Sequence, residues 1–388
     1  MQHLNSIIIG AGIGGLSTAL ALQRAGMRVR VYEQTDELGE VGAGLSLSPN
    51  ANVGLHYLGL AEPLATIGYQ PASFGIRHYQ TGELLIDNSQ EMTQENASGA
   101  PYYMVHRADL HALLVESVRS NDPDCIYMQH DFCKLNQTSD TVTAQFTNGI
   151  KTTADLLIGC DGIRSTVRAA LFGAESPRFT GYIAWRGLVP LENIDASTLT
   201  PESAICIGPG KTITRYLIGK RQLVNYVAVA QRSGWETESW SVHSDIAEVL
   251  EEFSEFHTSI REILAATPPE SCYKWALFDR DPLPDWSVKR ATLAGDAAHP
   301  MLPFMGQGAV MAIEDAVVLS RCLQESDSVA EALRRYEAAR KERCAMVMLE
   351  SRANIKRMQA DPSAYNKESH RNEQRLGLFD YNPATVPV

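Results

Sequence analysis

The feature that most constrains the fold is a glycine-rich turn early in the chain. An apolar run, Ser6 to Ile9, leads into the motif GAGIGG, and a helical pattern of apolar residues follows at once. The motif satisfies G-x-G-x-x-G. Such glycines permit a tight turn and let a pyrophosphate lie on a helix N-terminus, where unpaired N–H groups and the helix dipole favour negative charge. The pattern predicts a β-α-β unit with a strand over 6–9, a helix over about 13–25 and a second strand over 28–32.

An acidic residue at the end of the second predicted strand points to a dinucleotide. Glu33 lies 18 residues beyond Gly15, where a carboxylate accepts hydrogen bonds from an adenosine ribose and repels a 2′-phosphate. The alternative is a tight turn that binds no ligand, which is the weaker explanation because strand, helix and acid occur together. The residues predicted to bind the ADP half are Gly10, Gly12, Ile13, Gly14, Gly15, Glu33 and Gln34. The motif alone does not separate NAD from FAD.

Length and composition limit the remaining possibilities. A chain of 388 residues exceeds the size of most single cores, so we expect two packed domains. The formal net charge of −12 and the sequence pI near 5.4 argue against nucleic-acid binding, which requires clustered Lys and Arg. The seven cysteines form no C-x-x-C pair and no zinc spacing. This pattern is typical of reduced thiols in the cytoplasm and argues against dithiol redox chemistry.

The sequence shows no sign of export or of a membrane span. No Lys or Arg precedes the first apolar run, and glycines interrupt it. No stretch reaches the roughly 18 uninterrupted apolar residues that a membrane helix requires. We therefore expect a cytoplasmic protein with no membrane partner and no nucleic-acid partner.

The middle of the chain has a different pattern. Residues from about 181 to 230 contain successive apolar segments typical of antiparallel strands. A hairpin turn at Asn148-Gly149 precedes them, and a helix over about 245–266 and a strand over 273–278 follow. No second G-x-G-x-x-G occurs, which argues against a separate NAD(P) domain. The pattern predicts a sheet-rich domain inserted into the dinucleotide-binding domain.

Three further motifs place polar residues at strand ends or helix starts. Asp161-Gly162 ends a buried strand, and Gly295-Asp296 ends another. Arg107 opens a helix, where a cation is unfavourable for the dipole and requires an anionic partner. Each has an ordinary structural explanation: Asp161 as a helix cap, and Arg107 in a surface ion pair. Their significance depends on whether they occur together.

The stretch after Asp296 supplies what a flavin needs. A proline linker leads to four residues that present N–H groups at the start of a helix, Gly306, Gln307, Gly308 and Ala309. The buried side of this helix is predicted to comprise Val310, Ile313 and Val317. A flavin requires an acceptor for its ribityl hydroxyls and a positive dipole near N1 and O2. The complete set of motifs, in this order, predicts an FAD site.

With these motifs in place, the chain resembles the single-component (group A) FAD-dependent aromatic hydroxylases of the para-hydroxybenzoate hydroxylase fold. Its motif wording is closer to the salicylate hydroxylase and 6-hydroxynicotinate 3-monooxygenase branch, and the resemblance runs from Ile7 to about Glu342. It implies an α/β fold: a Rossmann-like FAD-binding domain of the glutathione-reductase-2 type, with an inserted antiparallel-sheet substrate domain and C-terminal helices. We assign residues 1–75, 101–180 and 281–388 to the FAD-binding domain, and 76–100 and 181–280 to the substrate domain.

The resemblance also implies roles for the motif residues in binding non-covalent FAD. Gly15, Glu33 and Arg107 would bind the ADP half, Asp296 the ribityl chain, and Gly306 to Ala309 the isoalloxazine edge. The remaining residues assigned to the cofactor by resemblance are Ser46, Phe132, Asp161 and Gly162, the last two belonging to a signature associated with both FAD and pyridine nucleotide.

The implied activity is hydroxylation of an electron-rich aromatic with NAD(P)H and O₂ through a flavin C4a-hydroperoxide. The substrate would be a phenolic acid such as a hydroxybenzoate, or a hydroxylated N-heteroaromatic. The choice between NADH and NADPH stays open, because Glu33 concerns only the FAD ribose. As partners we expect only the aromatic substrate, O₂ and NAD(P)H, bound by a monomer or a homodimer.

The substrate site is expected between the inserted sheet and the proline linker. Neighbouring strand residues point to opposite faces, so Arg215 and Tyr216 cannot both face the substrate; by resemblance Tyr216 is the better candidate, as a hydrogen-bond donor or base relay. Arg186 is either a bidentate partner of a substrate carboxylate or part of a structural ion pair. The predicted catalytic residues are Tyr216, Ser46, Pro303 and Phe304, and the predicted substrate-binding residues are Arg186, Arg215, Tyr216 and Phe304.

Two positions depart from the hydroxynicotinate enzyme. Ser46 and Phe304 stand where that enzyme has histidines, so the resemblance carries over no imidazole base. His299, in the linker before Pro300, favours a structural role over a catalytic one. No metal ligands are predicted.

Other functions on the same scaffold remain as alternatives. One is a flavin epoxidase or halogenase, or another oxidoreductase acting on a non-phenolic substrate, although no WxWxIP run typical of halogenases occurs. The other is a non-catalytic FAD-binding module. Flavin absorbance and NAD(P)H consumption separate these alternatives from a hydroxylase.

Overall fold

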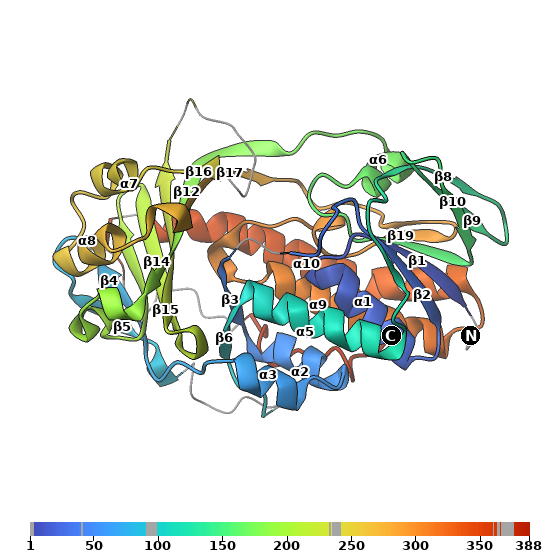
Figure 1. The fold of residues 1–388 in the computed structure, drawn as a ribbon, viewed down its shortest axis with the longest axis horizontal. Coiled ribbons are helices and arrows are strands. Elements are labelled where there is room, and N and C mark those ends of the chain that lie inside the picture. Colours follow the sequence, from blue (N-terminus) through green and yellow to red (C-terminus); the bar gives the residue numbers. More distant parts are fainter. Residues whose placement is uncertain are drawn as a thin grey trace.

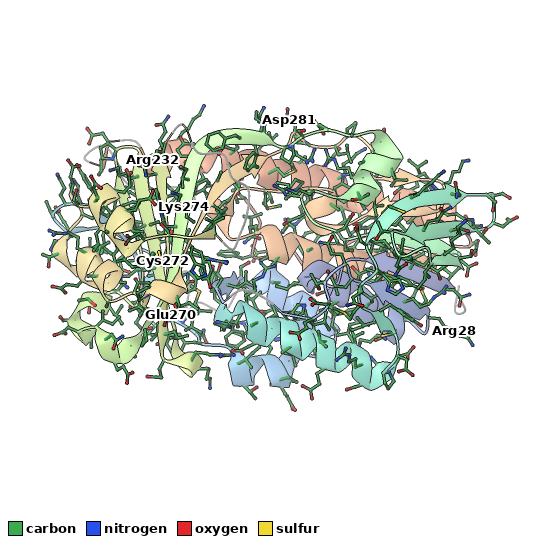
Figure 2. All side chains as sticks on the ribbon, turned by 45° about the horizontal axis from the view of Figure 1, so that its top comes forward. Arg28, Arg232, Glu270, Cys272, Lys274 and Asp281 are labelled. Carbon is green, nitrogen blue, oxygen red and sulfur yellow. The ribbon has the colours of Figure 1, made fainter. Side chains whose placement is uncertain are left out.

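The computed structural model describes residues 4–39, 42–90, 99–232, 234, 242–359, 361–362, 365 and 376–388. Two sheet-based halves lie side by side along the long axis, and the long helices run between them (Figure 1). Side chains fill both halves, and Arg28 and Lys274 lie in opposite halves of the molecule (Figure 2). The predicted fold class, an α/β domain with an inserted sheet-rich domain, is confirmed.

The first half is built on a six-stranded sheet that is parallel apart from one edge strand. Its strands, in spatial order, are β18 (Ser287–Val288), β19 (Ala291–Leu293), β11 (Leu156–Gly159), β1 (Asn5–Ile9), β2 (Arg28–Tyr32) and β7 (Ile126–Tyr127). Parallel strands buried on both faces read as continuous apolar runs, as β11 does. The carboxyl ends of β1, β2, β11 and β19 therefore meet at one edge of the sheet.

Helices and two small sheets surround this sheet. The helices are α1 (Ile13–Arg24), α2 (Pro49–Tyr57), α3 (Ala61–Ile67), α5 (Arg107–Asn121), α6 (Thr166–Phe172), α9 (Gly308–Glu325) and α10 (Val329–Met358). One small sheet pairs β3 (Gly44–Leu47) with β6 (Tyr103–His106). In the other, β9 (Val142–Phe146) lies between β8 (Phe132–Gln137) and β10 (Lys151–Ala154). α9 packs against both α1 and α10, and most of its side chains are buried.

The second half is a mixed, mainly antiparallel eight-stranded sheet. Its strands, in spatial order, are β16 (Val242–His243), β17 (Cys272–Asp279), β12 (Arg178–Pro190), β15 (Leu223–Gln231), β14 (Lys211–Ile218), β13 (Ser203–Gly208), β4 (Phe74–His78) and β5 (Leu84–Asp87). Its outer face packs against α7 (Ile246–Glu252) and α8 (Thr258–Ala265). Its inner face turns toward the first half, where Trp275 and Val229 pack against Leu302 and Ile355.

One predicted element divides in two. The helix expected over 245–266 is interrupted between Glu252 and Thr258. A second helix start explains the break, because the His257 side chain accepts a hydrogen bond from the Ser259 amide at the beginning of α8. Asp245 caps the first helix by accepting one from the Ala247 amide. Among the described residues, none of the helices combines the length and the apolar character needed to cross a bilayer.

Candidate functional site

The glycine turn is held by main-chain contacts at two of its glycines and is open at a third. Gly10 has φ of +101°, and a Cβ there would lie 2.5 Å from the Cys160 carbonyl oxygen. A Cβ on Gly15 would overlap the carbonyl oxygen of Gly10. A Cβ on Gly12 would meet nothing within 4 Å. Protein packing therefore explains Gly10 and Gly15, whereas the space beside Gly12 is what close approach of a pyrophosphate requires.

Glu33 is fixed beside this turn. Its Oε2 accepts a hydrogen bond from the Ala11 amide at 2.8 Å, and its Oε1 accepts one from the Thr35 amide at 3.1 Å. His111 of α5, which the sequence reasoning missed, places its Nε2 at 2.8 Å from the Ala11 carbonyl oxygen. The carboxylate and the first glycines thus form one unit at the end of β2.

Three other predicted cofactor residues differ in their settings. Ile13 is buried as the first residue of α1, and Gln34 is exposed just beyond β2. The Phe132 side chain is buried against Phe146, with ring centroids 6.5 Å apart. Its placement indicates a core side chain, so only its main chain could approach a nucleotide.

The Asp161 side chain caps the start of α6. Its Oδ1 accepts a hydrogen bond from the Ser165 hydroxyl at 2.5 Å, and its Oδ2 accepts one from the Val167 amide at 3.0 Å. Burial raises the pKa of this carboxyl, and the bonds from Ser165 and Val167 oppose the rise. The capping explanation thus accounts for the Asp161 side chain, while Gly162 supplies a left-handed turn with φ of +78°.

Asp296, unlike Asp161, is exposed. From Ala291 to Pro300 every residue is buried except Asp296. Gly295 adopts φ of +59°, and its amide donates to Asp315 Oδ2 at 2.9 Å. The surrounding protein raises the pKa of the Asp296 carboxyl, and the nearby charges of His299 and Arg107 lower it. A carboxylate exposed in a buried, anchored loop is suited to accept hydrogen bonds from a ligand.

The glycine turn, the Asp296 loop and the start of α9 converge. A Cβ on Gly14 and a Cβ on Gly295 would each lie 3.2 Å from Cβ of Ala312 on α9. A Cβ on Gly308, the first residue of α9, would lie 3.9 Å from Asp296 Oδ1. These three elements are far apart in the sequence and thus lie next to one another in the fold.

The loop before α9 lies against β3. Pro303–Met305 forms a 3₁₀ turn, Gly306 follows with φ of +63°, and Gln307 caps α9. A Cβ on Gly306 would lie 2.7 Å from the Ser46 hydroxyl oxygen. The Gln307 side chain is buried and donates to the Ser48 hydroxyl at 3.0 Å, so it serves the protein interior.

Tyr216 of the eight-stranded sheet lies against β3. A Cβ on Gly44, two residues before Ser46, would lie 2.6 Å from Tyr216 Cε2. Asn225, the cross-strand neighbour of Tyr216, accepts a hydrogen bond from the Gly44 amide at 2.8 Å. Burial raises the pKa of the Tyr216 hydroxyl far above its ordinary value. Tyr216 therefore stays protonated near neutral pH and can act as a hydrogen-bond donor.

Arg186 shares the inner face with Tyr216, and Arg215 does not. The Arg186 guanidinium lies over the rings of Tyr273 and Trp275, at 5.2 and 5.6 Å from their centroids. Phe304 packs at the same face beside Val227. Arg215 pairs across β15 with Tyr226, a residue of the outer-face core, and donates to the Glu202 carbonyl oxygen. Alternation along β14 thus removes Arg215 from the proposed substrate site.

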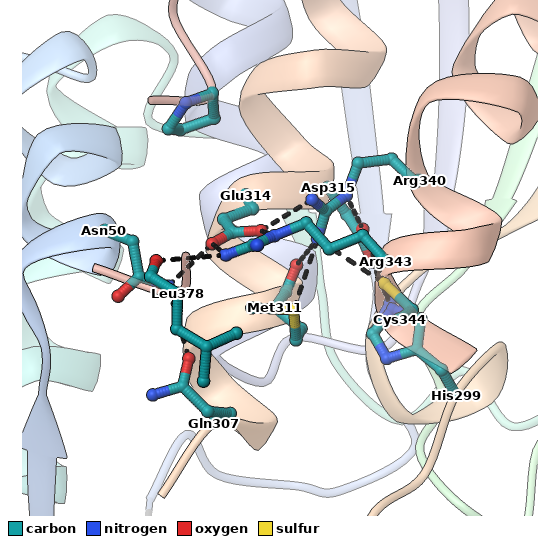
Figure 3. A network of polar contacts seen from close by, with 12 residues as sticks. Asn50, His299, Gln307, Met311, Glu314, Asp315, Arg340, Arg343, Cys344 and Leu378 are labelled. Atoms are coloured by element: carbon teal, nitrogen blue, oxygen red, sulfur yellow. Dashed lines mark hydrogen bonds and ion pairs between the residues drawn. The ribbon is translucent and has the colours of Figure 1, made fainter. Parts of the chain in front are cut away.

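Sequence reasoning missed three sets of residues. Asn225 and His111 gave no signal, because each is a single polar residue in an ordinary strand or helix. The third set is a buried charged network behind the start of α9, formed by Glu314, Asp315, Arg340 and Arg343 (Figure 3). It also includes His299, for which the sequence favoured a structural role. Two adjacent acids inside the apolar pattern of α9 were the available signal for this set.

The site fits FAD on two observations: open space at Gly12 and an exposed carboxylate at Asp296. The chain also matches a protein-family model described as an FAD binding domain over residues 3–351. It is 38% identical to a 3-amino-4-hydroxybenzoate 2-monooxygenase of Streptomyces platensis, over 91% of this chain and 89% of that one.

Two further similarities extend over nearly the whole chain. The chain is 36% identical to a 6-hydroxynicotinate 3-monooxygenase of Pseudomonas fluorescens, over 92% of both chains. Its fold matches the crystal structure of Klebsiella pneumoniae HpxO complexed with FAD and uric acid, with a TM-score of 0.85, 26% identity, and coverage of 98% of this chain and 96% of that one.

Proposed function

The chain belongs to the FAD-binding domain family and is an FAD-dependent aromatic monooxygenase that uses NAD(P)H, and we propose that its own substrate is a phenolic acid. The predicted family, enzyme class and cofactors are confirmed.

The proposed cofactor site uses four parts of the chain. The glycine turn and the N-terminus of α1 would hold the pyrophosphate, and Glu33 the adenosine ribose. Asp296 would accept hydrogen bonds from the ribityl hydroxyls. The N-terminus of α9, from Gly308, would place a positive dipole near the ring. Bound FAD supplies the hydride acceptance and oxygen activation that side chains cannot provide.

The proposed substrate rests mainly on one observation: Tyr216 and Arg186 lie on the same inner face of the eight-stranded sheet. Tyr216 is held against Gly44 of β3, and Arg186 lies one strand beyond Asn225 on the same face. Because burial keeps Tyr216 protonated, its hydroxyl would donate a hydrogen bond to the ring oxygen of a phenolic substrate. Arg186 would bind a carboxylate on the same ring.

Apolar side chains complete the proposed site. Phe304, with Val227 and Leu302, belongs to an apolar cluster at the junction of the sheet and the loop before α9. Such a cluster would hold an aromatic ring close to the loop at Gly306 and exclude water, which matters because activated oxygen exposed to water is lost without hydroxylation. These residues position the substrate and keep its surroundings dry.

The relatives support an aromatic acid, and two positions favour a phenolic one. One relative is named for 3-amino-4-hydroxybenzoate and another for 6-hydroxynicotinate. By our reading of the resemblance, Ser46 and Phe304 replace two histidines of the hydroxynicotinate enzyme. The imidazole groups suited to a hydroxypyridine are then missing, while a phenol requires only the donor at Tyr216.

The test combines cofactor content with product analysis. Purified protein should carry flavin absorbance, and NADH or NADPH oxidation should rise with a hydroxybenzoate or an aminohydroxybenzoate more than with hydroxynicotinate. Mass spectrometry should show one added oxygen. If NAD(P)H oxidation rises but no hydroxylated product forms, the compound is an effector, and a protein that cannot be reconstituted with FAD would sink the assignment.

We also place the enzyme in the cytoplasm. All seven cysteines are free in the structure, and Cys125, Cys206, Cys272, Cys322 and Cys344 are buried. Free thiols are ordinary in a reducing compartment. The same compartment supplies NAD(P)H.

A further inference from the structure

Two adjacent acids on α9 reach two different loops of the proposed cofactor site. Glu314 and Asp315 are both fully buried, one turn and more beyond the start of the helix. Their carboxylates are joined by Arg340 of α10, as Figure 3 shows. Buried charges persist only when paired and hydrogen-bonded, so each contact in this network matters to its neighbours.

Asp315 anchors the loop that carries Asp296. Its Oδ2 accepts hydrogen bonds from the Gly295 amide at 2.9 Å and from His299 Nε2 at 2.6 Å. These donors stand on either side of Asp296. The cations His299 and Arg340 lower the pKa of Asp315 to about 2 despite its burial. Asp315 therefore holds both ends of the proposed ribityl-binding loop.

Glu314 anchors the other loop through a side-chain relay. Its Oε1 accepts a hydrogen bond from Asn50 Nδ2 at 2.7 Å. The same Asn50 nitrogen lies 3.2 Å from Gln307 Oε1, and Gln307 donates to the Ser48 hydroxyl. Gln307 lies between Gly306 and Gly308, the residues proposed to meet the flavin ring. Glu314 thus fixes the ring-edge loop against the end of β3.

Arg340 joins the contacts made by Asp315 to those made by Glu314. Its Nε donates to Asp315 Oδ1 at 2.8 Å, and its Nη1 donates to Glu314 Oε2 at 2.5 Å. Of the two acids, Arg343 donates only to Glu314, one hydrogen bond to each carboxylate oxygen. The planar guanidinium fixes the directions of its donors, so one rigid group sets the spacing of both carboxylates.

We propose that Arg340 is a positioning residue for FAD, holding the ribityl-binding loop and the ring-edge loop in fixed register. This inference rests on the proposed cofactor site. Arg340 touches neither loop directly and lies on α10, outside the predicted cofactor residues. Its effect should fall on the flavin half of FAD and spare the ADP half, which Gly10 to Gly15 and Glu33 would bind.

The test compares two ligands on one variant. Arg340→Lys keeps the buried positive charge but loses the fork, so it can satisfy only one carboxylate at a time. FAD binding to the apoprotein, measured by quenching of flavin fluorescence, should weaken about 10-fold or more, which corresponds to about 1.4 kcal/mol. ADP binding, measured by calorimetry, should change less than about twofold, within the few tenths of a kcal/mol expected of independent sites.

Arg335→Lys is the matched control. Arg335 lies on the same helix and donates to the Glu325 carbonyl oxygen and the Ser326 hydroxyl, with no contact to Glu314 or Asp315. It should leave the affinities for both ligands unchanged. If Arg340→Lys weakens FAD and ADP equally, or weakens neither, Arg340 has a general structural role at most and the inference fails.

A second variant covers the case in which Arg340→Lys does not fold. Asn50→Ser breaks the relay from Glu314 to Gln307 without altering any buried charge, and it should also weaken FAD selectively. An unchanged ratio of FAD to ADP affinity for this variant would overturn the inference. Wild-type protein that binds ADP but no FAD would instead overturn the proposed function, so the two failures are distinguishable.

Discussion

The proposed site consists mainly of main-chain groups in one half of the molecule and mainly of side chains in the other. In the first half the site is mostly main chain: the ends of parallel strands, glycines and helix N-termini, with Glu33 and Asp296 as the main side chains. In the second half it is a set of side chains on one face of a sheet, including Tyr216 and Arg186. The main-chain part has no room for an added atom at Gly10 or Gly15, whereas the side-chain part can change residue by residue on an unchanged sheet.

From this contrast we propose separate roles for the halves. A cofactor that is the same for every substrate is matched by backbone geometry, which few substitutions can alter without disturbing the fold. A substrate that differs between enzymes is matched by side chains that alternate along strands. Variants in the first half should therefore change flavin content, and variants in the second half should change substrate kinetics at normal flavin content.

The largest expected effect is that of Gly15→Ala. The new Cβ would overlap the Gly10 carbonyl oxygen, so the turn must open, and both flavin content and thermal stability should collapse. Gly12→Ala is the informative partner, because its Cβ meets no protein atom. It should melt like the wild-type apoprotein yet bind FAD at least 10-fold more weakly. Normal FAD affinity in Gly12→Ala would contradict the proposed path of the pyrophosphate.

The next effect is that of Arg186→Gln in the second half. Loss of a charge-assisted hydrogen bond to a carboxylate costs about 1.5–3 kcal/mol, so KM for a phenolic acid should rise roughly 10- to 100-fold. Flavin content should not change. Arg215→Met provides the comparison on the outer face: it should alter stability but leave KM alone. Equal KM changes in both variants would remove the distinction between the two faces.

Tyr216→Phe should have a smaller effect. Removing one neutral donor costs about 0.5–1.5 kcal/mol, or up to about 10-fold in kcat/KM. Because burial raises the Tyr216 pKa, the wild-type rate should show no ionisation of this residue near neutral pH, and the variant should keep the same pH profile. An alkaline limb that vanishes in the variant would identify Tyr216 as a base.

The smallest effect concerns the His299–Asp315 pair behind the first-half site. Burial lowers the pKa of His299, but its neighbours Cys344 and Asp315 outweigh burial and hold that pKa well above its ordinary value. A raised histidine pKa stabilises the fold fully below about pH 6.5 and loses this effect as pH rises. The lowered pKa of Asp315 stabilises it above about pH 4 and loses this effect toward pH 2.

Urea unfolding at several pH values measures this effect. The wild type should exceed His299→Gln by about 1 kcal/mol between about pH 4 and 6.5, and the difference should shrink at alkaline pH. A difference that grows with rising pH would mean that His299 is neutral in the folded protein.

The contrast between the halves also explains what could be predicted from sequence. The β-α-β unit was predictable because glycines, Glu33 and apolar runs are local signals, and α1 ends at Arg24, one residue before its predicted end. The interruption of the helix after Glu252 was not, because the cap at His257 resembles an ordinary polar residue of an amphipathic pattern. Partners such as Asn225 to Gly44 depend on packing between segments 181 residues apart, which leaves no local trace.

The order of strands in the six-stranded sheet bears on how the chain folds. Gly159 of β11 pairs with Leu293 of β19, and six strands of the eight-stranded sheet lie between them in the sequence. Distant pairings form slowly because closing a long loop costs entropy first. The inserted sheet, with hairpins such as β14–β15, should therefore consolidate earlier. The edge that carries Asp296 would then be among the last parts to form, so flavin uptake would report completed folding.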